Sequence, residues 1–167
     1  MENNKNLTAA NEEVVELVIP IKYFDDSVEP IEKIQKGDWI DLRSREDILL
    51  YPGEEALIPL NVAMQLPEGY EAHLAPRSST FKKWGIIQTN SVGVIDNTYC
   101  GDNDEWKMGV YCLVGRDDVD GVKGSMIHKG DRVAQFRIMP VQPKIKFEMV
   151  TVLGNADRDG FGSTGTN

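Results

Sequence analysis

Apolar residues along the chain form short runs that turn-forming residues separate. The run over 14–24 is rich in β-branched and aromatic residues and contains Pro20, so we expect a strand there, at the edge of a sheet. Further short apolar runs stand at 39–42, 48–51, 56–60, 62–66, 70–74, 86–87, 92–95, 108–114, 126–128, 133–139 and 145–152. Turn-forming residues punctuate them, and the stretch 115–124 is expected to be one such turn. About a dozen short strands spaced by turns predict an all-β sandwich or barrel.

No stretch sustains a helical period for long, and one short helix is expected over 80–84. Ser78 or Ser79 is its predicted N-cap, because a hydroxyl at that position can accept a hydrogen bond from a free backbone N–H. Gly85 is expected to end the helix, because glycine adopts the left-handed conformation without strain.

The length of 167 residues is that of one domain, a β-barrel that we place at 16–153. Residues 1–12 are polar and lack periodicity, so we expect a flexible N-terminal arm over 1–15. Residues 154–167 contain four glycines and one aromatic residue, Phe161, and bury too little apolar surface to fold alone. We expect a mobile C-terminal lid there, in which glycine lets backbone N–H groups approach phosphate, with a frayed tail as the alternative.

The composition is that of a soluble globular protein, with 41% apolar and 27% charged residues. Lys and Arg number 18 against 27 Asp and Glu, and the net charge of −9 argues against nucleic acid as a partner but permits a small phosphate site. No apolar run is long enough to span a bilayer or to direct secretion, so we expect no membrane partner and a cytoplasmic location. Cys100 and Cys112 are expected to be free thiols.

Two segments have the composition of an anion site and of a base-binding hairpin. Arg77 lies beside the hydroxyls of Ser78 and Ser79 at the start of the expected helix, a combination suited to phosphate, although a plain N-cap with a solvated Arg is the alternative. Residues 90–101 have the pattern of strand, tight turn and strand, with Asp96 in the turn. The backbone edge of such a hairpin can meet a flat polar ring, whereas a turn Asp by itself is ordinary turn chemistry.

Two further segments place polar residues on expected strands. Asp41 stands amid apolar neighbours in 37–43, where a carboxylate is costly unless it is paired or serves a metal. Residues 129–136 lead from a charged turn into an alternating strand that contains Gln135. The sequence has no P-loop, no dinucleotide-binding glycine motif and no serine-hydrolase elbow, so it does not indicate those function classes.

Taken in order, these segments resemble the five motifs of the homotrimeric dUTPase family, the dUTP diphosphatases. Gly-Val-Ile-Asp-x-x-Tyr-x-Gly at 93–101 and Gly-Phe-Gly-Ser-Thr-Gly at 160–165 are the most specific, and the other motifs stand at 37–42, 75–80 and 130–136. The overlap covers about residues 16–165, and the stretch 77–85 looks like the branch of Gram-positive bacteria and their phages. The resemblance implies an all-β, distorted jelly-roll or β-barrel fold of the β-clip type, with one short helix and a flexible Gly-rich tail.

By the same resemblance, the chain hydrolyses dUTP to dUMP and pyrophosphate with Mg²⁺, which keeps uracil out of DNA and supplies dUMP for thymidylate synthesis. Asp96 is the carboxylate that activates the attacking water. The residues expected to bind the phosphates, or to hold the site, are Arg77, Ser78, Ser79, Gln135 and Arg158, with Asp41 contributing to the metal only through water. The family is a homotrimer with active sites at subunit clefts, over which the tail of a neighbour closes.

Base selection is expected to come from the hairpin. The resemblance implies that uracil bonds to the backbone of Gly93, Val94 and Ile95 and to the amide of Asn90. Tyr99 is expected to pack against deoxyribose and to leave no room for a 2′-hydroxyl. The expected substrate contacts of the closing tail are Phe161, which covers the uracil, and Gly162, Ser163 and Thr164.

Three features depart from the family pattern. Ser79 stands where many members have glycine, and Arg158 lies three residues before Phe161 where many members have a spacing of five. Residues 102–106 extend the chain after the motif at 93–101. We expect an acidic, solvated loop there, and the alternative is that it brings Trp106 near the base.

Two other functions are weighed against dUTP hydrolysis. A dCTP deaminase of the same fold would release ammonia rather than pyrophosphate, but the position of Asp96 two residues before Thr98 fits the hydrolase pattern better. A phage-type, nucleotide-gated binding protein with a regulatory protein partner is the second alternative. Such a protein would not need Arg77, Asp96 and Gln135 together, and this combination favours the enzyme.

Overall fold

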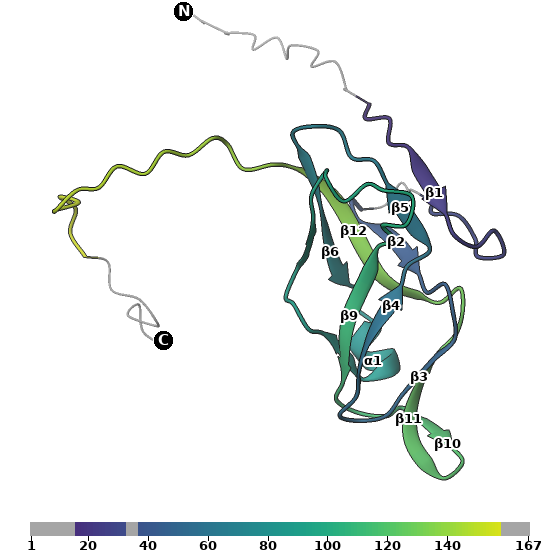
Figure 1. Cartoon of the computed structure of the whole chain (residues 1–167). Helices are drawn as coiled ribbons and strands as arrows, with labels where there is room; N and C mark the ends of the chain where they lie inside the picture. The colour runs from purple at the N-terminus through teal and green to yellow at the C-terminus, as the bar shows by residue number, and fades with distance from the viewer. Residues whose placement is uncertain (1–15, 33–36, 158–167) are drawn as a thin grey trace, which may run out of the picture.

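A computed structural model describes residues 16–32 and 37–157, and the folded body that it describes is almost entirely β-structure (Figure 1). The strands are β1 (Ile21–Tyr23), β2 (Ile40–Arg43), β3 (Ile48–Leu50), β4 (Glu55–Pro59), β5 (Val62–Met64), β6 (Tyr70–Pro76), β7 (Ile86–Gln88), β8 (Gly93–Ile95), β9 (Lys107–Cys112), β10 (Asp117–Val119), β11 (Val122–Ile127) and β12 (Arg132–Pro140). Within these ranges the only helix is α1 (Thr80–Trp84), which is too short to cross a membrane. The all-β prediction with one short helix over 80–84 is therefore confirmed.

The strands form four small antiparallel sheets, none of which closes into a complete barrel. Their orders are β1-β5, β10-β11-β3, β2-β12-β6-β8 and β4-β9-β7. The four-stranded sheet is the largest, and β12 lies inside it, paired with β2 along one edge and with β6 along the other. Strand β8 forms the outer edge of this sheet, because within one chain it pairs only with β6.

Apolar side chains from the facing sheets meet in one core. Trp106 is fully buried and meets the ring of Phe136 edge-on, with centroids 5.3 Å apart and an interplanar angle of 90°. Such T-shaped aromatic pairs add stability beyond the area that they bury. Cys112 lies in this core and Cys100 is exposed, and both are free thiols, as expected.

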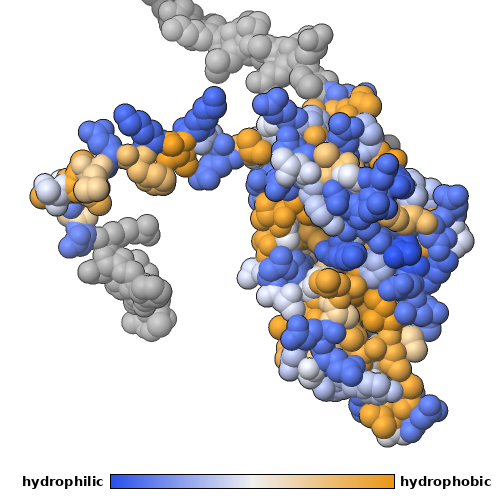
Figure 2. All heavy atoms as spheres, in the orientation of Figure 1, coloured by the Kyte–Doolittle hydropathy of each residue, from blue (hydrophilic) through white to orange (hydrophobic). Residues whose placement is uncertain are grey.

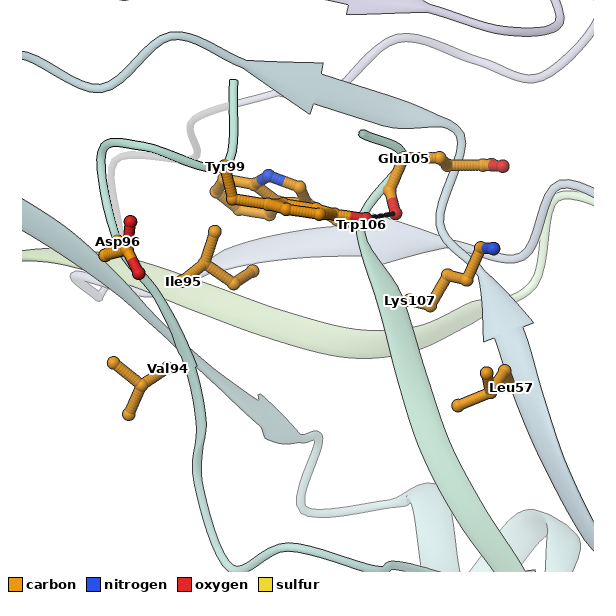
Figure 3. Close-up of a pocket in the computed structure, with 8 residues that line it drawn as sticks. All are labelled: Leu57, Val94, Ile95, Asp96, Tyr99, Glu105, Trp106 and Lys107. Carbon is orange, nitrogen blue, oxygen red and sulfur yellow. Dashed lines mark hydrogen bonds between the residues drawn. The ribbon is translucent and has the colours of Figure 1, made fainter. Parts of the chain in front are cut away.

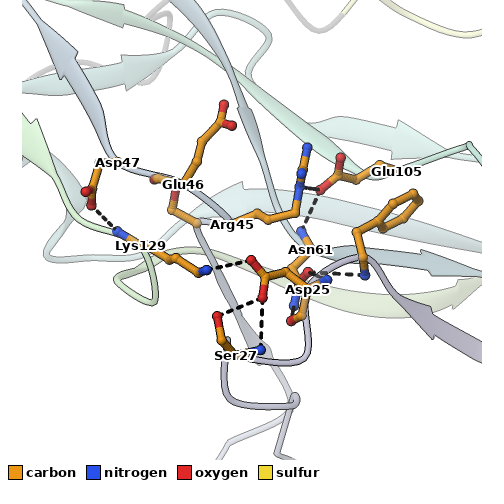
Figure 4. Close-up of polar contacts among 10 residues, drawn as sticks. Asp25, Ser27, Arg45, Glu46, Asp47, Asn61, Glu105 and Lys129 are labelled. Carbon is orange, nitrogen blue, oxygen red and sulfur yellow. Dashed lines mark hydrogen bonds and ion pairs between the residues drawn. The ribbon is translucent and has the colours of Figure 1, made fainter.

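The segment 102–106 differs from the prediction of a solvated loop, because its last two residues are buried. Glu105 is only 5% exposed, and its carboxylate accepts hydrogen bonds from Arg45 Nε at 2.8 Å and from the backbone N–H of Asn61 at 3.0 Å (Figure 4). The backbone of Trp106 bonds to Val62 and Leu60. The buried ion pair compensates for the cost of removing the carboxylate from water, which is why an acidic segment can enter the core.

The same network continues through Asn61 to the loop after β1 and to the turn before β12 (Figure 4). Asn61 has a φ of 66° and its side-chain oxygen accepts from the backbone N–H groups of Phe24 and Asp25. The Asp25 carboxylate binds Lys129 Nζ and Ser27, and these hydrogen bonds hold the pKa of Asp25 well below its ordinary value. The chain before β2 is thereby attached to the turn that leads into β12.

Three local expectations are corrected. Ser79 occupies the N-cap position of α1, but its side chain makes no capping hydrogen bond. Thr80 Oγ1 instead accepts from the N–H of Arg77 at 3.0 Å and donates to the carbonyl of Val133 at 2.9 Å. Of the described part of the strand expected over 14–24, only β1 is formed. The region 115–124, expected to be a turn, contains β10 and the start of β11 instead, because Asp120 and Gly121 both adopt positive φ and close a hairpin.

After β12 the chain leaves the body in an extended path, visible as the yellow-green arm in Figure 1. The strand expected over 145–152 is not formed, and none of the described strands pairs with this segment. Phe147 is 91% exposed and Met149 is 99% exposed, and Figure 2 shows the arm as alternating apolar and polar groups. The predicted arm over 1–15 and the lid beyond residue 157 lie outside the described residues.

Replacing Gly85 by alanine is expected to destabilise the fold by more than about 3 kcal/mol. Gly85 has a φ of 62°, and an added Cβ would lie 1.8 Å from the carbonyl oxygen of Val114, so backbone strain and a clash add together. Gly69→Ala is the matched control, because Gly69 has a φ of 86° with open space around it and should lose only about 1 kcal/mol. The free energy of unfolding in urea measures both, and equal losses would contradict this account of Gly85.

Candidate functional site

A pocket of about 460 Å³ opens beside the turn that follows β8 (Figure 3). On one side of it lie the residues of the sequence-predicted hairpin, and across from them lie residues of β4, of β9 and of the segment before β9. The lining residues are Val94, Ile95, Asp96, Tyr99, Leu57, Glu105, Trp106 and Lys107. Aromatic and aliphatic walls with one carboxylate at the mouth suit a flat ring that carries a polar group.

Asp96 is exposed and is held by the turn that it begins. One carboxylate oxygen, Oδ1, accepts from the backbone N–H of Thr98 at 2.8 Å and from the Thr98 hydroxyl. These two hydrogen bonds, the hydroxyl's first, lower the pKa of Asp96 below its ordinary value, because they stabilise the charged form. Among the described residues nothing bonds to Oδ2, so a fixed, ionised carboxylate presents one oxygen to solvent at the pocket mouth.

Tyr99 forms a wall of the same pocket. Its hydroxyl donates to the backbone carbonyl of Glu105 at 3.2 Å, which fixes the ring, and 41% of the residue remains exposed. Burial raises the pKa of Tyr99, and the carboxylates of Asp104 and Glu105 raise it further, so the phenol stays neutral. The structure thus brings Tyr99 and Asp96 to one pocket, as the sequence predicted.

The outer edge of β8 runs beside this pocket. Gly93, Val94 and Ile95 face Leu74, His73 and Ala72 across the inner edge, and none of the described strands of the chain pairs with the other edge. Unpaired backbone groups of an edge strand can bind a ligand that presents a complementary row of donors and acceptors. Asn90 precedes this strand, and its side-chain oxygen accepts from Gln88 Nε2 at 3.1 Å.

A second cluster joins three of the other motifs. Asp41 on β2 accepts from Arg77 Nε at 2.7 Å and from Arg132 Nη1 at 3.3 Å, so the carboxylate predicted to need a partner has two. Gln135 lies opposite Asp41 in the β12–β2 pairing, and its Nε2 donates to the carbonyl of Pro76. Two guanidinium groups around one carboxylate leave a net positive charge, which suits an anion.

The two serines after Arg77 lie at the rim of this cluster. Ser78 is exposed and Ser79 is half-buried, in the turn that leads into α1. Among the described residues, neither side chain has a hydrogen-bond partner within the protein. Arg158, Phe161, Gly162, Ser163 and Thr164 lie outside the described residues.

The cationic cluster and Asp96 lie at opposite ends of the sheet within one chain. Arg77 follows the end of β6, whereas Asp96 follows Ile95, which faces Ala72 near the start of β6. Five residues of strand between Ala72 and Arg77 correspond to about 17 Å. The residues predicted to contact one triphosphate are therefore not all brought together by a single chain.

Several residues of the site were not predicted as such. Arg132 begins the strand that contains Gln135, but the two lie three residues apart, and this spacing predicts opposite faces of a regular strand. The irregular register between Arg132 and Ala134 changes that arrangement and could not be read from the sequence. The segment 102–106 ends with Glu105 and Trp106, and Lys107 follows it; all three line the pocket. The apolar side chain of Trp106 was the one signal in the sequence that this acidic segment could enter the core. Leu57 comes from β4, and nothing in its local pattern distinguishes it from a core residue.

The donor set of the described residues shows what kind of metal site is available. No group of three or more His, Cys, Asp or Glu side chains is arranged around a common point in the ranges 16–32 and 37–157. Asp41 already binds two guanidinium groups. A Mg²⁺ ion is commonly bound by one or two carboxylates together with substrate phosphates and waters, and only that kind of site fits these residues.

Comparison with known proteins gives consistent matches. The dUTPase family model matches residues 35–165. The SPbeta prophage-derived deoxyuridine 5'-triphosphate nucleotidohydrolase YosS of Bacillus subtilis is 53% identical over 148 residues, which are 89% of this chain and 98% of that protein. The deoxyuridine 5'-triphosphate nucleotidohydrolase of Hydrogenobaculum sp. is 37% identical over 149 residues, 86% of this chain and 94% of that protein.

Solved structures share the fold at lower sequence identity. A mutant of the Staphylococcus bacteriophage 80alpha dUTPase with dUpNHpp has a TM-score of 0.72 at 22% identity, covering 89% of this chain and 99% of that one. A mutant dUTPase from phage phi11 of S. aureus, described with a structural Mg(II) ion, has a TM-score of 0.68 at 21% identity and covers 82% and 99%. The distorted jelly-roll-like architecture expected from the sequence is confirmed by these neighbours.

Replacing Thr98 by valine is expected to raise the pKa of Asp96 toward its ordinary value, because the hydroxyl that favours the charged form is removed. In the wild-type protein, ionised Asp96 stabilises the fold at pH values above its unfolded-state pKa. This contribution is lost as the pH falls through the lowered folded-state pKa. Because the folded-state pKa is higher in the variant, the variant should lose the contribution at a higher pH. Carboxyl ¹³C NMR during a pH titration measures the pKa. Thr98→Ser keeps the hydroxyl and should leave it unchanged, and an unshifted value in Thr98→Val would refute the assigned cause.

Proposed function

The chain belongs to the dUTPase family, and from that premise we propose that it hydrolyses dUTP to dUMP and pyrophosphate with Asp96 as the residue that activates water. The observation that carries the proposal is the turn-held carboxylate of Asp96, with one oxygen directed to solvent at the mouth of a pocket that Tyr99 and Trp106 line. A dUTP diphosphatase needs such a carboxylate next to a nucleoside site.

In the proposed reaction, water attacks the α-phosphorus in line with the bond to the leaving pyrophosphate. The water oxygen forms a bond to phosphorus, the bond from phosphorus to the bridging oxygen breaks, and pyrophosphate leaves with the bonding electrons. Asp96 orients the water and accepts its proton as charge moves to the phosphate. Because its pKa is lowered, Asp96 is ionised at neutral pH and is ready to accept a hydrogen bond from the water.

The triphosphate is proposed to bind at the cluster of Asp41, Arg77 and Gln135. The substrate carries about four negative charges and approaches a protein of net charge −9, so a local positive field is required. Asp41 holds Arg77 in place through the bond at 2.7 Å, and Arg132 adds a second guanidinium. The proposed further donors are Ser78, Ser79, Arg158, Gly162, Ser163 and Thr164.

Mg²⁺ is proposed to arrive with the triphosphate and to be bound by phosphate oxygens and waters, with Asp41 accepting hydrogen bonds from that water shell. When bound, the ion would neutralise phosphate charge and favour departure of pyrophosphate. The protein's contribution is to keep the carboxylate of Asp41 fixed between Arg77 and Arg132.

The nucleoside is proposed to bind along the free edge of β8. The backbone of Gly93, Val94 and Ile95 would bond to uracil, and Tyr99 would pack against the deoxyribose. A hydrogen-bonding site of this kind rejects a base with the reversed edge, because buried groups would lose their partners. Phe161 of the C-terminal tail is proposed to cover the base.

The active unit is proposed to be a homotrimer, with each site at a cleft between subunits. The separation of about 17 Å between Arg77 and Asp96 along β6 supports this, because one triphosphate cannot touch both within one chain. A second copy can bring its cationic cluster to the first copy's Asp96. The exposed apolar arm after β12, with Phe147 and Met149, also has the character of a segment that another chain covers.

The two alternatives are separable by product and by variant. A dCTP deaminase would release ammonia from dCTP, whereas the proposed enzyme releases pyrophosphate from dUTP. A nucleotide-gated binding protein with a regulatory partner would bind dUTP without turnover. The fixed carboxylate of Asp96 and the paired Arg77 favour the hydrolase, because binding alone has no use for a water-activating group.

Asp96→Asn is expected to lower turnover of dUTP by at least ~100-fold, the scale for loss of a positioned base, while nucleotide binding persists. Pyrophosphate release from dUTP with and without Mg²⁺ gives the rate, and calorimetry with a non-hydrolysable analogue gives the affinity. Asp118→Asn is the matched control, because Asp118 also begins a tight turn, where it accepts from the N–H of Gly121, but lies on the distant β10–β11 hairpin. Near-normal turnover in Asp96→Asn would refute its role.

Mixing two inactive variants tests whether the site is shared between subunits. Arg77→Ala and Asp96→Asn chains, refolded together in equal amounts, should recover about one quarter of the wild-type rate, because that fraction of sites receives both intact residues from different chains. Each variant refolded alone serves as the baseline. If Arg77 and Asp96 of the same chain acted on one triphosphate, the mixture would stay as inactive as its components.

A further inference from the structure

Gln88, at the end of β7, contacts both the sheet and the residue proposed to read the base. Its Nε2 donates to the carbonyl of Leu74 at 3.3 Å and to Oδ1 of Asn90 at 3.1 Å. Its Oε1 is buried and has no hydrogen-bond partner among the described residues. Burying an amide oxygen without a partner costs free energy, so at this position the donor is the useful half of the side chain.

The chemistry of these contacts fixes the orientation of both amides. The carbonyl of Leu74 can only accept, so Gln88 must direct its NH₂ group toward it. The same NH₂ group faces Asn90, so Asn90 must present its oxygen to Gln88. The NH₂ group of Asn90 therefore points away from Gln88, and within the described part of the chain nothing accepts from it.

The side chain of Gln88 lies beside Gly93, the first residue of β8. Gly93 faces Leu74 in the β6–β8 pairing, and a Cβ on Gly93 would lie 3.1 Å from Cβ of Leu74 and 3.5 Å from Nε2 of Gln88. The glycine that begins the base-binding hairpin thus leaves the space in which the Gln88 amide lies. The contact joins β7 to the edge of the sheet that leads to Asp96.

We propose that Gln88 is a specificity-determining positioning residue, which holds the Asn90 amide so that it offers a donor, and not an acceptor, to the pyrimidine. This inference rests on the proposed binding of uracil beside β8 and Asn90. Uracil has a carbonyl acceptor at position 4, which the Asn90 NH₂ group can satisfy, whereas cytosine has an amino donor there, which it would oppose. Gln88 acts through Asn90 and does not contact the base.

Two substitutions at Gln88 change the amide of Asn90 in graded ways. Gln88→Met keeps the length of the side chain and removes both hydrogen bonds, so Asn90 becomes free to turn. Gln88→Glu offers only acceptors to Asn90, so it favours the turned amide with the Asn90 oxygen toward the base. The preference for uracil over cytosine should therefore fall from wild type to Gln88→Met and further to Gln88→Glu.

The measurement is the ratio of the dissociation constants for dCMP and dUMP, determined by calorimetry, together with kcat and KM for dUTP and the inhibition constant of dCTP. We expect the ratio to fall at least tenfold in Gln88→Met and more in Gln88→Glu, with KM for dUTP raised and kcat within about threefold of wild type. Circular dichroism reports whether each variant is folded. If Gln88→Glu is unfolded, the dissociation-constant ratio of Gln88→Met alone tests the inference.

Ser125→Ala is the control for a merely structural role. It removes a buried hydrogen bond, from Ser125 Oγ to the carbonyl of Trp84, remote from the pocket, and should lower the melting temperature without changing base preference. If the Gln88 variants lower only the melting temperature, or if the wild-type protein itself does not prefer dUMP, the inference is overturned. Absence of dUTP turnover with selective dUMP binding would instead overturn hydrolysis and leave the role of Gln88 standing.

Discussion

The pairing of β6 with two partners is the constraint on which the rest of the site depends. One edge of β6 binds β12 over seven residue pairs, and the other edge binds the short β8. The first pairing brings Gln135 beside Ala75 and close to Arg77, and the second sets where the turn at Asp96 emerges. Since both pairings use the same strand, the distance between the cationic cluster and the carboxylate is fixed by strand length, and no side-chain movement can bridge it.

A buried polar network supports the pocket from behind. Glu105 bonds to Arg45 and to the backbone of Asn61, and its carbonyl accepts the hydroxyl of Tyr99. The hydrogen bond to Glu105 raises the pKa of Arg45, so the guanidinium stays charged. A wall of the pocket beside β8 is thereby attached to elements near the N-terminal end of the body, and the hydrogen bond to the carbonyl of Glu105 holds the ring of Tyr99 in place.

The sequence predicted those parts of the structure that local chemistry determines. The glycine at the end of α1 and the turn at Asp96 were predictable, because each depends on a residue whose conformation is special in any context. Pairing across the fold was not predictable. Asp41 was predicted to need a partner, yet one of its two arginines, Arg77, comes from the turn after β6, and the other, Arg132, begins β12 and was not singled out. The burial of Glu105 could not be read from an acidic run, because the compensating Arg45 lies 60 residues away in the sequence.

The errors have the same origin. The apolar alternation over 145–152 predicts a strand, but a strand needs a neighbour, and none of the described strands pairs with this segment. Conversely, the stretch 115–124 looked like a turn because it is short of apolar residues, and the Asp120-Gly121 pair that closes its hairpin was the overlooked signal.

In the proposed trimer, the arm after β12 would link catalysis to protein abundance. The arm exposes aliphatic and aromatic side chains to water, and covering them with another chain lowers the free energy of the system. By mass action, the fraction of arms that are covered depends on the protein concentration. At low copy number in a cell, dilution would leave chains unassembled and their sites half-built. The total rate of dUTP hydrolysis would then rise more steeply than the amount of protein made. A modest change in expression would therefore switch the activity on or off.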